Sequence, residues 1–459
     1  MSSARQDVTQ PRGSTGEAAR QSLSWNDGPG WHRADEIVQR VQAPTFPDRD
    51  VLVEDHGAVG DDSTDCTAAI AAAVQAAHRS GGGRVVLGQG SYRTGPIHLL
   101  SNVNLHVAGG STVRFYTDPD RCLPLVPTRW QGVELMGYSP LVYANGAENV
   151  AITGGGTLDG SADNDHWWSW CGREQYGWHE GIVPQEAHWQ TLVDMVRRGV
   201  PPQERRTGPG WHLRPNMIEL NRCRNVWLQG VRIRRSPMWV IHPVLCTNVL
   251  VEDVEVVSHG PNNDGFDPES CTDVVVRRCH FDVGDDSIAI KSGREDDGER
   301  VNEPCRNVVI EDCTMVMKYG AFTIGSELTG GVSDVYVRRC RIGSPNLWYG
   351  LYIKSNAARG GYVENVYVQD VDATEMQREF VSCNLHRGEG LDGPRTPLIR
   401  NIDIRDVRVG RARRALHMAG FEHAPITDVR LTDCVFESMA EESVVTDVVG
   451  LELTNVTPL

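Results

Sequence analysis

Short runs of alternating apolar and polar residues recur along most of the chain. Each run opens with Asn or Asp, continues with Val or Ile, and carries an aliphatic residue two positions later, a pattern typical of a β-strand. The runs open at residues 102, 149, 225, 248, 273, 307, 334, 365, 401 and 428. From residue 225 onward their starts lie 23, 25, 34, 27, 31, 36 and 27 residues apart, which is the length of a solenoid repeat rather than of a strand and turn.

Each run is too short to bury its inner side chains alone, so the runs are expected to stack. Stacked coils bury a continuous core of Val, Ile, Leu and Cys, and the opening Asn or Asp tolerates the left-handed backbone of a tight turn. The alternative is a β-sandwich, in which turns recur about every 8–12 residues and hairpin signals such as Asn-Gly join the strands. Such joins are scarce here. The pattern therefore predicts an all-β fold, a single-domain parallel β-helix over residues 51–459.

Three segments depart from the repeat. Residues 67–80 are Ala-rich and end before three glycines, which predicts a helix that caps the N-terminal end of the solenoid. Residues 1–50 predict an N-terminal tail and lead-in, disordered over about the first 20 residues. Residues 160–215 predict an insertion whose tryptophans either line a carbohydrate-binding cleft or anchor the insertion. These tryptophans include Trp167, Trp168, Trp170, Trp178 and Trp189.

The composition argues against some partners. The net charge of −16 disfavours nucleic acid, whose phosphates require a basic surface. No apolar run approaches the roughly 18 residues of a membrane-spanning helix, so no membrane partner is expected. The first residues lack the apolar core of a signal peptide, which predicts a cytoplasmic protein. The sequence carries no indication of the oligomeric state.

The twelve cysteines fall largely at two fixed positions of the repeat. Cys223, Cys246 and Cys271 each stand just before a run, whereas Cys279 and Cys313 stand at a second repeated position. Regular placement in a repeat indicates small buried side chains rather than a disulfide framework. We therefore predict free thiols, in keeping with a reducing compartment.

Two acidic clusters lie in the stretch of residues 261–293. Asp264 in the first cluster precedes Asp285 and Asp286 in the second by about one coil. In a solenoid, residues one coil apart lie about 4.8 Å from each other. Like charges so close raise at least one pKa, so one carboxylic acid can remain beside ionised carboxylates, as hydrolysis of a glycosidic bond requires. We predict that Asp264, Asp285 and Asp286 are catalytic.

The same carboxylates, with Asn262 beside them, are also good oxygen ligands for calcium. The stretch lacks the regularly spaced Asp and Asn positions of a calcium-binding loop. We therefore expect hydrolysis without a metal or any other cofactor.

Seven motifs follow one another along the chain: HGAVGDDSTD at residue 56, TGPIHLLSNVNLHV at 94, GGGTLDG at 154, SPMWVIHPV at 236, PNNDGFDPES at 261, GDDSIAIKSG at 284 and GSELTGGV at 325. With them the chain resembles glycoside hydrolase family 28, the polygalacturonase family, over residues 50–459, and most of all its bacterial exo-acting members. The resemblance implies a right-handed parallel β-helix and metal-free, inverting hydrolysis of an oligosaccharide. It also implies that Asp285 is the general acid and that Asp264 and Asp286 hold and deprotonate the water. For an inverting pair we expect carboxyl groups roughly 6.5–9.5 Å apart.

Two positions depart from the family pattern. Tyr319 stands where the family has His and Tyr352 where it has Arg, whereas Lys354 is kept. That Arg meets a uronate carboxylate in the family, which a guanidinium fork binds bidentately. Tyr offers one hydroxyl and a flat apolar face, which suit a neutral sugar. No Arg lies between 342 and 358, so we predict a terminal sugar other than plain galacturonate and weak activity on polygalacturonate.

Four functions follow from these patterns. The leading hypothesis is an exo-acting glycoside hydrolase, with substrate-binding candidates Asn262, His242, Lys291, Tyr319, Tyr352 and Lys354. The second is an exo-polygalacturonase in which Lys354 and loop residues replace the lost Arg. A non-catalytic carbohydrate-binding protein has no need of three crowded acids, and a lyase or epimerase would use a Lys or Arg base.

Overall fold

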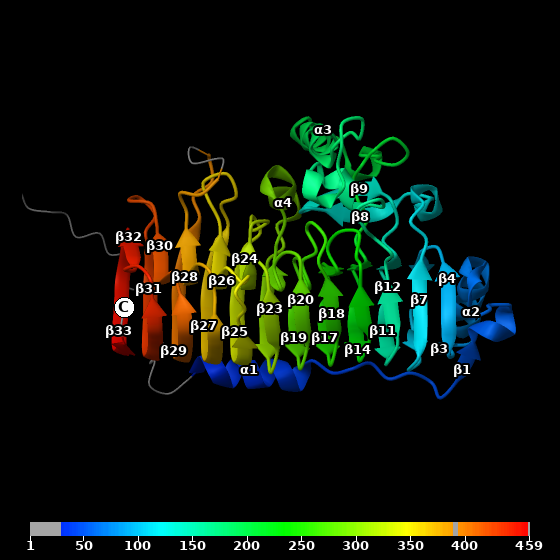
Figure 1. The fold of residues 1–459 in the computed structure, drawn as a ribbon, viewed down its shortest axis with the longest axis horizontal. Helices are drawn as coiled ribbons and strands as arrows, with labels where there is room; N and C mark the ends of the chain where they lie inside the picture. Colours follow the sequence, from blue (N-terminus) through cyan, green and yellow to red (C-terminus); the bar gives the residue numbers. More distant parts are fainter. Residues whose placement is uncertain (1–28, 389–392, 458–459) are drawn as a thin grey trace, which may run out of the picture.

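The protein, described by a computed structural model over residues 29–388 and 393–457, is an elongated parallel β-helix of three ladders (Figure 1). The first ladder forms one continuous face along the whole solenoid. Its strands are β1 (Asp50–Leu52), β3 (Gly83–Leu87), β6 (Val103–Val107), β11 (Glu148–Gly154), β14 (Arg224–Gln229), β17 (Thr247–Glu252), β19 (Thr272–Arg277), β22 (Cys305–Glu311), β25 (Val332–Ile342), β27 (Tyr362–Glu375), β29 (Leu398–Ala412), β31 (Ile426–Met439) and β33 (Val448–Thr457).

The second ladder merges with the first at β25, where one long strand spans both faces. Its strands are β2 (Asp61–Asp65), β4 (Gly90–Thr94), β7 (Ser111–Phe115), β12 (Thr157–Asp159), β15 (Arg232–Arg234), β18 (Glu255–Ser258), β20 (His280–Val283) and β23 (Thr314–Met317). The third ladder consists of β5 (Ile97–His98), β10 (Val142–Asn145), β13 (Ile218–Asn221), β16 (Ile241–Val244), β21 (Ile288–Ile290), β24 (Gly320–Gly325), β26 (Tyr349–Lys354), β28 (Glu379–Asn384), β30 (Arg414–Ala419) and β32 (Val444–Thr446).

The predicted stacking register is confirmed. Val226 pairs with Val249, Val249 with Val274 and Val274 with Val308, each one run further along the chain. These valines are all buried, so the second position of each run builds a continuous inner row. All twelve cysteines are free thiols in the structure, and all except Cys171 are buried.

The Asn or Asp that opens each run adopts the left-handed conformation expected of it. All ten of these residues have φ between 56° and 66°. Their side chains also bond to one another across coils: the Asn225 Nδ2 donates to Asn149 Oδ1 over 2.9 Å, and the Asn248 Nδ2 donates to Asn225 Oδ1 over 2.8 Å. The same side chain therefore permits the turn and ties it to the next coil.

The predicted capping helix is α2 (Thr67–Arg79), which covers the N-terminal end of the solenoid through buried Ile70, Ala73 and Val74. A second helix, α1 (Pro29–Arg40), was not predicted from the lead-in. It lies along the outside of the first ladder, where Ile37 and Val41 pack on a row of outward apolar residues (Figure 1). That row is Leu250, Val275, Val309, Tyr336 and Tyr367. The tail predicted for the first 20 residues lies outside the described residues.

The predicted insertion contains α3 (Gln185–Arg197) and joins a hairpin of β8 (Val126–Trp130) and β9 (Val133–Gly137). With α4 (Glu295–Val301), these elements stand above the third ladder (Figure 1). Most of the insertion tryptophans act as anchors: Trp167 is buried against the core, and the Trp168 Nε1 donates to the Ser236 carbonyl over 2.9 Å. Within the described residues, no helix is long and apolar enough to cross a membrane.

The row of hydrogen-bonded turn residues predicts that two substitutions at Asn248 differ in their effect on stability. Asn248→Ala removes the bond to Asn225 and places a Cβ-bearing residue without a polar side chain at φ 59°. We expect the free energy of unfolding to fall by roughly 1–3 kcal/mol. Asn248→Gly loses the same bond but adopts positive φ freely, so its loss is expected to be smaller. Denaturant unfolding curves measure both, and equal losses would contradict the assigned role of the left-handed backbone.

Candidate active site

The predicted acids lie on the outward face of the third ladder, where one coil has no regular strand. Residues 264–269 take the place of a strand between β16 and β21, held by isolated bridges from Phe266 to Ile241 and to Ile288. Asp264 therefore lies one coil before Asp285 and Asp286, which precede β21. Small residues at the neighbouring outward positions, Ala289 and Thr323, leave room above the sheet.

The three aspartates meet as predicted. One carboxylate oxygen from each of Asp264, Asp285 and Asp286 lies within 4.8 Å of the others. Asp286 is fully buried and its Oδ1 accepts hydrogen bonds from the Gly320 N–H (2.8 Å) and the Thr323 hydroxyl (2.9 Å). Asp285 is partly exposed, and its Oδ1 accepts from the Asp286 N–H over 3.1 Å. Asp286 is thus fixed in position, while Asp285 faces solvent.

Two lysines neutralise the acidic cluster. The Lys354 ammonium is bonded directly to Asp286 Oδ2. The Lys291 Nζ lies 3.6 Å from Asp264 Oδ2, 3.4 Å from Asp267 Oδ1 and 3.1 Å from Glu327 Oε2. Burial alone would lower the pKa of Lys291, but these carboxylates raise it well above the ordinary value, so both lysines are cations at neutral pH.

The environment sets the acids apart from ordinary aspartates. Burial, and then the charges of Asp267 and Asp285, raise the pKa of Asp264 well above its usual value. Burial and the neighbouring Asp286 raise the pKa of Asp285 to about 6. Asp267, fully buried behind them, has its pKa raised to about 7 by burial. The site can therefore hold a proton on one carboxyl group while others are ionised, because the groups titrate as a coupled set.

The geometry of the three oxygens would also suit a metal ion, since carboxylates are oxygen ligands. The ammonium groups of Lys354 and Lys291 already lie against Asp286 and Asp264. A bound cation would face repulsion from both of these groups. The donor set therefore fits acid–base chemistry better than metal binding.

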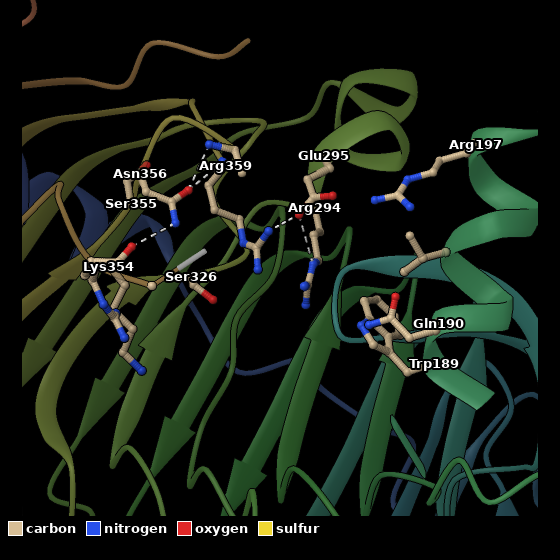
Figure 2. Close-up of a pocket in the computed structure, with 14 residues that line it drawn as sticks. Trp189, Gln190, Arg197, Arg294, Glu295, Ser326, Lys354, Ser355, Asn356 and Arg359 are labelled. Carbon is tan, nitrogen blue, oxygen red and sulfur yellow. Dashed lines mark hydrogen bonds and ion pairs between the residues drawn. The ribbon is translucent and has the colours of Figure 1, made fainter. Parts of the chain in front are cut away.

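A cavity of about 460 Å³ begins at Lys354 and ends against α3 (Figure 2). Trp189, Gln190 and Arg197 from α3 face Lys354 and Ser326 across it, with Arg294 and Glu295 between. The cations that line this cavity are Arg197, Arg294, Lys354, Arg359 and Arg387. Glu295 is the one acidic residue among the described residues of the lining, so the cavity is cationic in a protein of net charge −16.

A second cavity, of about 530 Å³, lies on the next coils and combines aromatic rings with arginines. Its lining includes Trp348, Tyr349 and Tyr352 together with Arg378, Arg387, Arg413 and Arg414. None of the three aspartates lines either cavity. Lys354, which is bonded to Asp286, lines the first cavity. Tyr352, two residues earlier on β26, lines the second cavity.

Comparison with known proteins identifies the family. The family model described as "Glycosyl hydrolases family 28" matches residues 207–447, which include the acids and both lysines. The chain belongs to glycoside hydrolase family 28. It is therefore a glycoside hydrolase that acts on O-glycosyl bonds.

Individual relatives agree with this membership. A "Probable polygalacturonase" from Vitis vinifera is 27% identical over 422 residues, 88% of this chain and 78% of the relative. The crystal structure of a hyperthermoactive exopolygalacturonase from Thermotoga maritima superposes with a TM-score of 0.89 at 41% identity, covering 93% of this chain and 96% of that one. A family 28 exopolygalacturonase from Yersinia enterocolitica, 19% identical, shares the fold with a TM-score of 0.63 over 89% of this chain and 78% of its own. The predicted right-handed parallel β-helix is confirmed.

The tyrosines at the two positions that depart from the family 28 pattern pack against different aromatic side chains. Tyr319 packs edge-on against Trp348, with ring centroids 4.4 Å apart. Tyr352 stacks on Tyr349 at 4.0 Å, and both the Lys354 ammonium and the Arg387 guanidinium lie over its ring. Tyr352 is 8% exposed, so its ring acts mainly as a support for the two cations.

His242 does not lie on the cleft surface, in contrast to the prediction that it faces the sugar. Its side chain is fully buried, with Nε2 2.8 Å from Glu269 Oε2 and Nδ1 3.6 Å from Glu219 Oε2. Burial alone would lower the pKa of His242, but the two carboxylates raise it to about 9. Trp239 packs edge-on against this imidazole, and the Lys291 ammonium lies 4.4 Å from the centroid of the Trp239 ring. His242 thus supports Lys291 indirectly, through Trp239, which contacts both side chains.

Asn262 is a positioning residue in this arrangement. Its backbone is left-handed, with φ 55°, and its Oδ1 accepts a 2.6 Å bond from Arg214 Nη2. Arg214 is fully buried and also donates to the Pro261 carbonyl over 2.7 Å. The loop that carries Asp264 is thereby tied to the end of the insertion.

Sequence reasoning missed several residues that shape the site. Gly320 was overlooked, although a Cβ there would lie 2.9 Å from Asp286 Oδ1 and 2.0 Å from Thr323 Oγ1. Glu327 was quoted only within a motif, yet Lys291 and Arg294 beside it hold its pKa at about 2 despite burial. Arg387 lies far along the chain, and no periodic signal points to it.

The contact between Lys354 and the acids predicts a pH effect. The family resemblance implies that Asp285 is the general acid. Because a general acid is active while protonated, we expect kcat/KM to fall as pH rises through about 6. Lys354 lowers the pKa of Asp285, so Lys354→Met should move this alkaline limb to higher pH. Lys354→Arg keeps the charge and should leave the limb near its original position. A limb in Lys354→Met that stays in place or moves to lower pH would contradict this assignment.

Proposed function

We propose that this family 28 hydrolase is exo-acting and releases terminal uronate, galacturonate above all, from pectic oligosaccharides by inverting hydrolysis. The observation that carries the proposal is the cationic cavity that opens at Lys354 beside the acids. A uronate carries one carboxylate per sugar, and arginine guanidinium groups are the side chains best matched to it. The exopolygalacturonase from Thermotoga maritima, 41% identical over almost the whole chain, supports the same substrate class.

The insertion supports the exo mode of action. Helix α3 stands across one end of the first cavity, where Trp189 and Arg197 line the wall (Figure 2). Trp189 is itself packed against Trp130 at 5.4 Å, so this wall is anchored. A cleft closed at one end accepts the end of a chain and excludes a long polymer from passing through. The Trp-rich insertion would therefore determine where the terminal sugar of the oligosaccharide lies in the cleft.

The acids supply the chemistry in the proposed mechanism. Asp285, partly exposed and with its pKa raised to about 6, protonates the glycosidic oxygen of the leaving group. Asp264 and Asp286 hold a water molecule and accept its proton as its oxygen attacks the anomeric carbon. The Gly320 N–H, the Thr323 hydroxyl and Lys354 fix Asp286 for this task. Lys291 compensates the charge of Asp264.

The three aspartates form one tight cluster. One oxygen from each lies within 4.8 Å of the others, whereas the roughly 6.5–9.5 Å expected of an inverting pair is a separation between whole carboxyl groups. Inversion requires Asp264 and Asp286 to hold the water on the face of the anomeric carbon opposite the leaving group that Asp285 protonates. The proposed inversion therefore rests on the family resemblance.

The prediction of a sugar other than galacturonate rested on the absence of an arginine near Lys354 in the sequence. The fold supplies Arg359 from the loop that follows Lys354 and Arg387 from the next coil, so that reason for excluding galacturonate does not hold. The apolar surfaces of Tyr319 and Trp348 favour a neutral or mixed sugar at a neighbouring position. A rhamnogalacturonan-type oligosaccharide is accordingly the second candidate substrate.

Replacing the acids should abolish turnover without unfolding the protein. Asp285→Asn removes the proton donor, and general acid catalysis contributes roughly 10²–10⁴-fold, so kcat on oligogalacturonate should fall at least ~10³-fold. Asp264→Asn and Asp286→Asn should show comparable losses. The buried thiols provide a control, because an unchanged number of reactive cysteines indicates an intact fold. Near-full activity in all three variants would show that the site is assigned wrongly.

Product analysis tests the substrate, the exo mode and the stereochemistry together. On trigalacturonate, we expect monomeric galacturonate as the first product, with its anomeric configuration inverted in proton NMR spectra taken within minutes. Galacturonate released with retained configuration would exclude inversion. Random internal cleavage of longer oligomers would exclude exo action, and rapid turnover of neutral or mixed oligosaccharides with none of trigalacturonate would exclude galacturonate as the terminal sugar.

A further inference from the structure

Arg387 lies at the border between the two cavities and lines both. It follows β28, three coils after Asp286. Its guanidinium carbon is 5.1 Å from the centroid of the Tyr352 ring, and the Lys354 ammonium is 4.9 Å from the same centroid. Arg387 and the lysine that contacts Asp286 thus lie against the same aromatic side chain.

The charge of Arg387 has no carboxylate partner among residues 29–388 and 393–457. Two of its neighbours in the second cavity are paired with carboxylates: Arg413 lies 2.8 Å from Glu441, and Arg414 pairs with both Glu379 and Glu441. A third, Arg378, donates to the Tyr349 hydroxyl over 3.2 Å. Lys354 is likewise engaged with Asp286. Arg387 therefore places a positive charge beside the Tyr352 ring, and no carboxylate of the described residues compensates it.

We propose that Arg387 binds the carboxylate of the uronosyl residue next to the cleaved bond and selects charged over neutral sugars. It would replace, from another coil, the arginine whose position in the sequence is occupied by Tyr352. The guanidinium fork matches a carboxylate bidentately, and the Tyr352 ring holds it in place by a cation–π contact. This inference rests on the proposed function, because it requires a uronate substrate.

The Arg387 side chain makes no hydrogen bond to the rest of the described protein, so its replacement leaves the coil intact. Its backbone carbonyl accepts a 3.2 Å bond from Asn356 Nδ2, which any residue at this position retains. Arg387→Gln therefore removes the positive charge and its contact with the Tyr352 ring. Arg413→Gln is a matched control, since it removes a cation from the same cavity that is already paired with Glu441.

The test compares kcat/KM on trigalacturonate and on its fully methyl-esterified form, which has the same sugars without the charge. We expect Arg387→Gln to lose roughly tenfold to a hundredfold on the charged substrate and little on the ester, since charge-assisted bonds are lost. Arg387→Lys should recover part of the selectivity, and Arg413→Gln should change neither value by more than about twofold.

The outcomes separate this inference from the proposed function. If the wild-type protein hydrolyses trigalacturonate and Arg387→Gln loses activity equally on both substrates, or on neither, Arg387 is not the selecting residue and the proposed function stands. If the wild-type protein hydrolyses only the ester or neutral oligosaccharides, both fail. Loss of charge selectivity in Arg387→Gln alone supports both.

Discussion

Parallel pairing between successive coils is the constraint on which the rest of this structure depends. It fixes the distance between neighbouring coils and leaves each outward residue beside its counterparts one coil before and after. Along the third ladder, Glu219, His242, Ala289, Thr323, Tyr352, Ser382 and His417 occupy one such outward row. Residues separated by dozens of positions in the chain thereby become side-by-side contributors to one surface, and a functional site is a segment of these rows.

The electrostatics of the site follow from this crowding. Asp264, Asp285 and Asp286 repel one another because the coils hold them together, and Lys291 and Lys354 make that arrangement tolerable. Next to them, on the coils that precede Asp285, the buried network of Glu219, His242 and Glu269 continues the alternation of charges. Each charged side chain is paired mainly with charged side chains on adjacent coils. The stacking of the coils therefore accounts both for how the acids are held in place and for their reactivity.

The sequence was most informative where a repeat controls the structure. The valines of the runs predicted the register residue by residue, and the left-handed Asn and Asp predicted the turns, because both depend on local geometry. The spacing of about one coil between Asp264 and Asp285 predicted that their carboxyl groups meet. The burial of His242 could not be predicted, because the alternation of residues in β16 does not indicate that Trp239 covers the outward face of this strand.

Other features depend on surfaces that form only when distant segments meet. Helix α1 was missed because its partner is a row of third-position residues, Leu250 to Tyr367, whose apolar character appeared to be part of ordinary strands. Arg387 was missed for a related reason. The lengths of the loops between strands vary, so distance along the sequence did not indicate which arginine reaches the ring of Tyr352.

The position of α1 has a consequence for the order in which the chain acquires its structure. The row on which this helix rests is assembled from strands β17 to β27, and its last member, Tyr367, is more than three hundred residues further along the chain. During synthesis, the apolar face of α1 therefore has no partner until the central coils exist. Among the described helices, α1 comes first in the chain but can reach its final position only after the central coils have formed, and it then packs across five coils that would otherwise be joined only to their immediate neighbours.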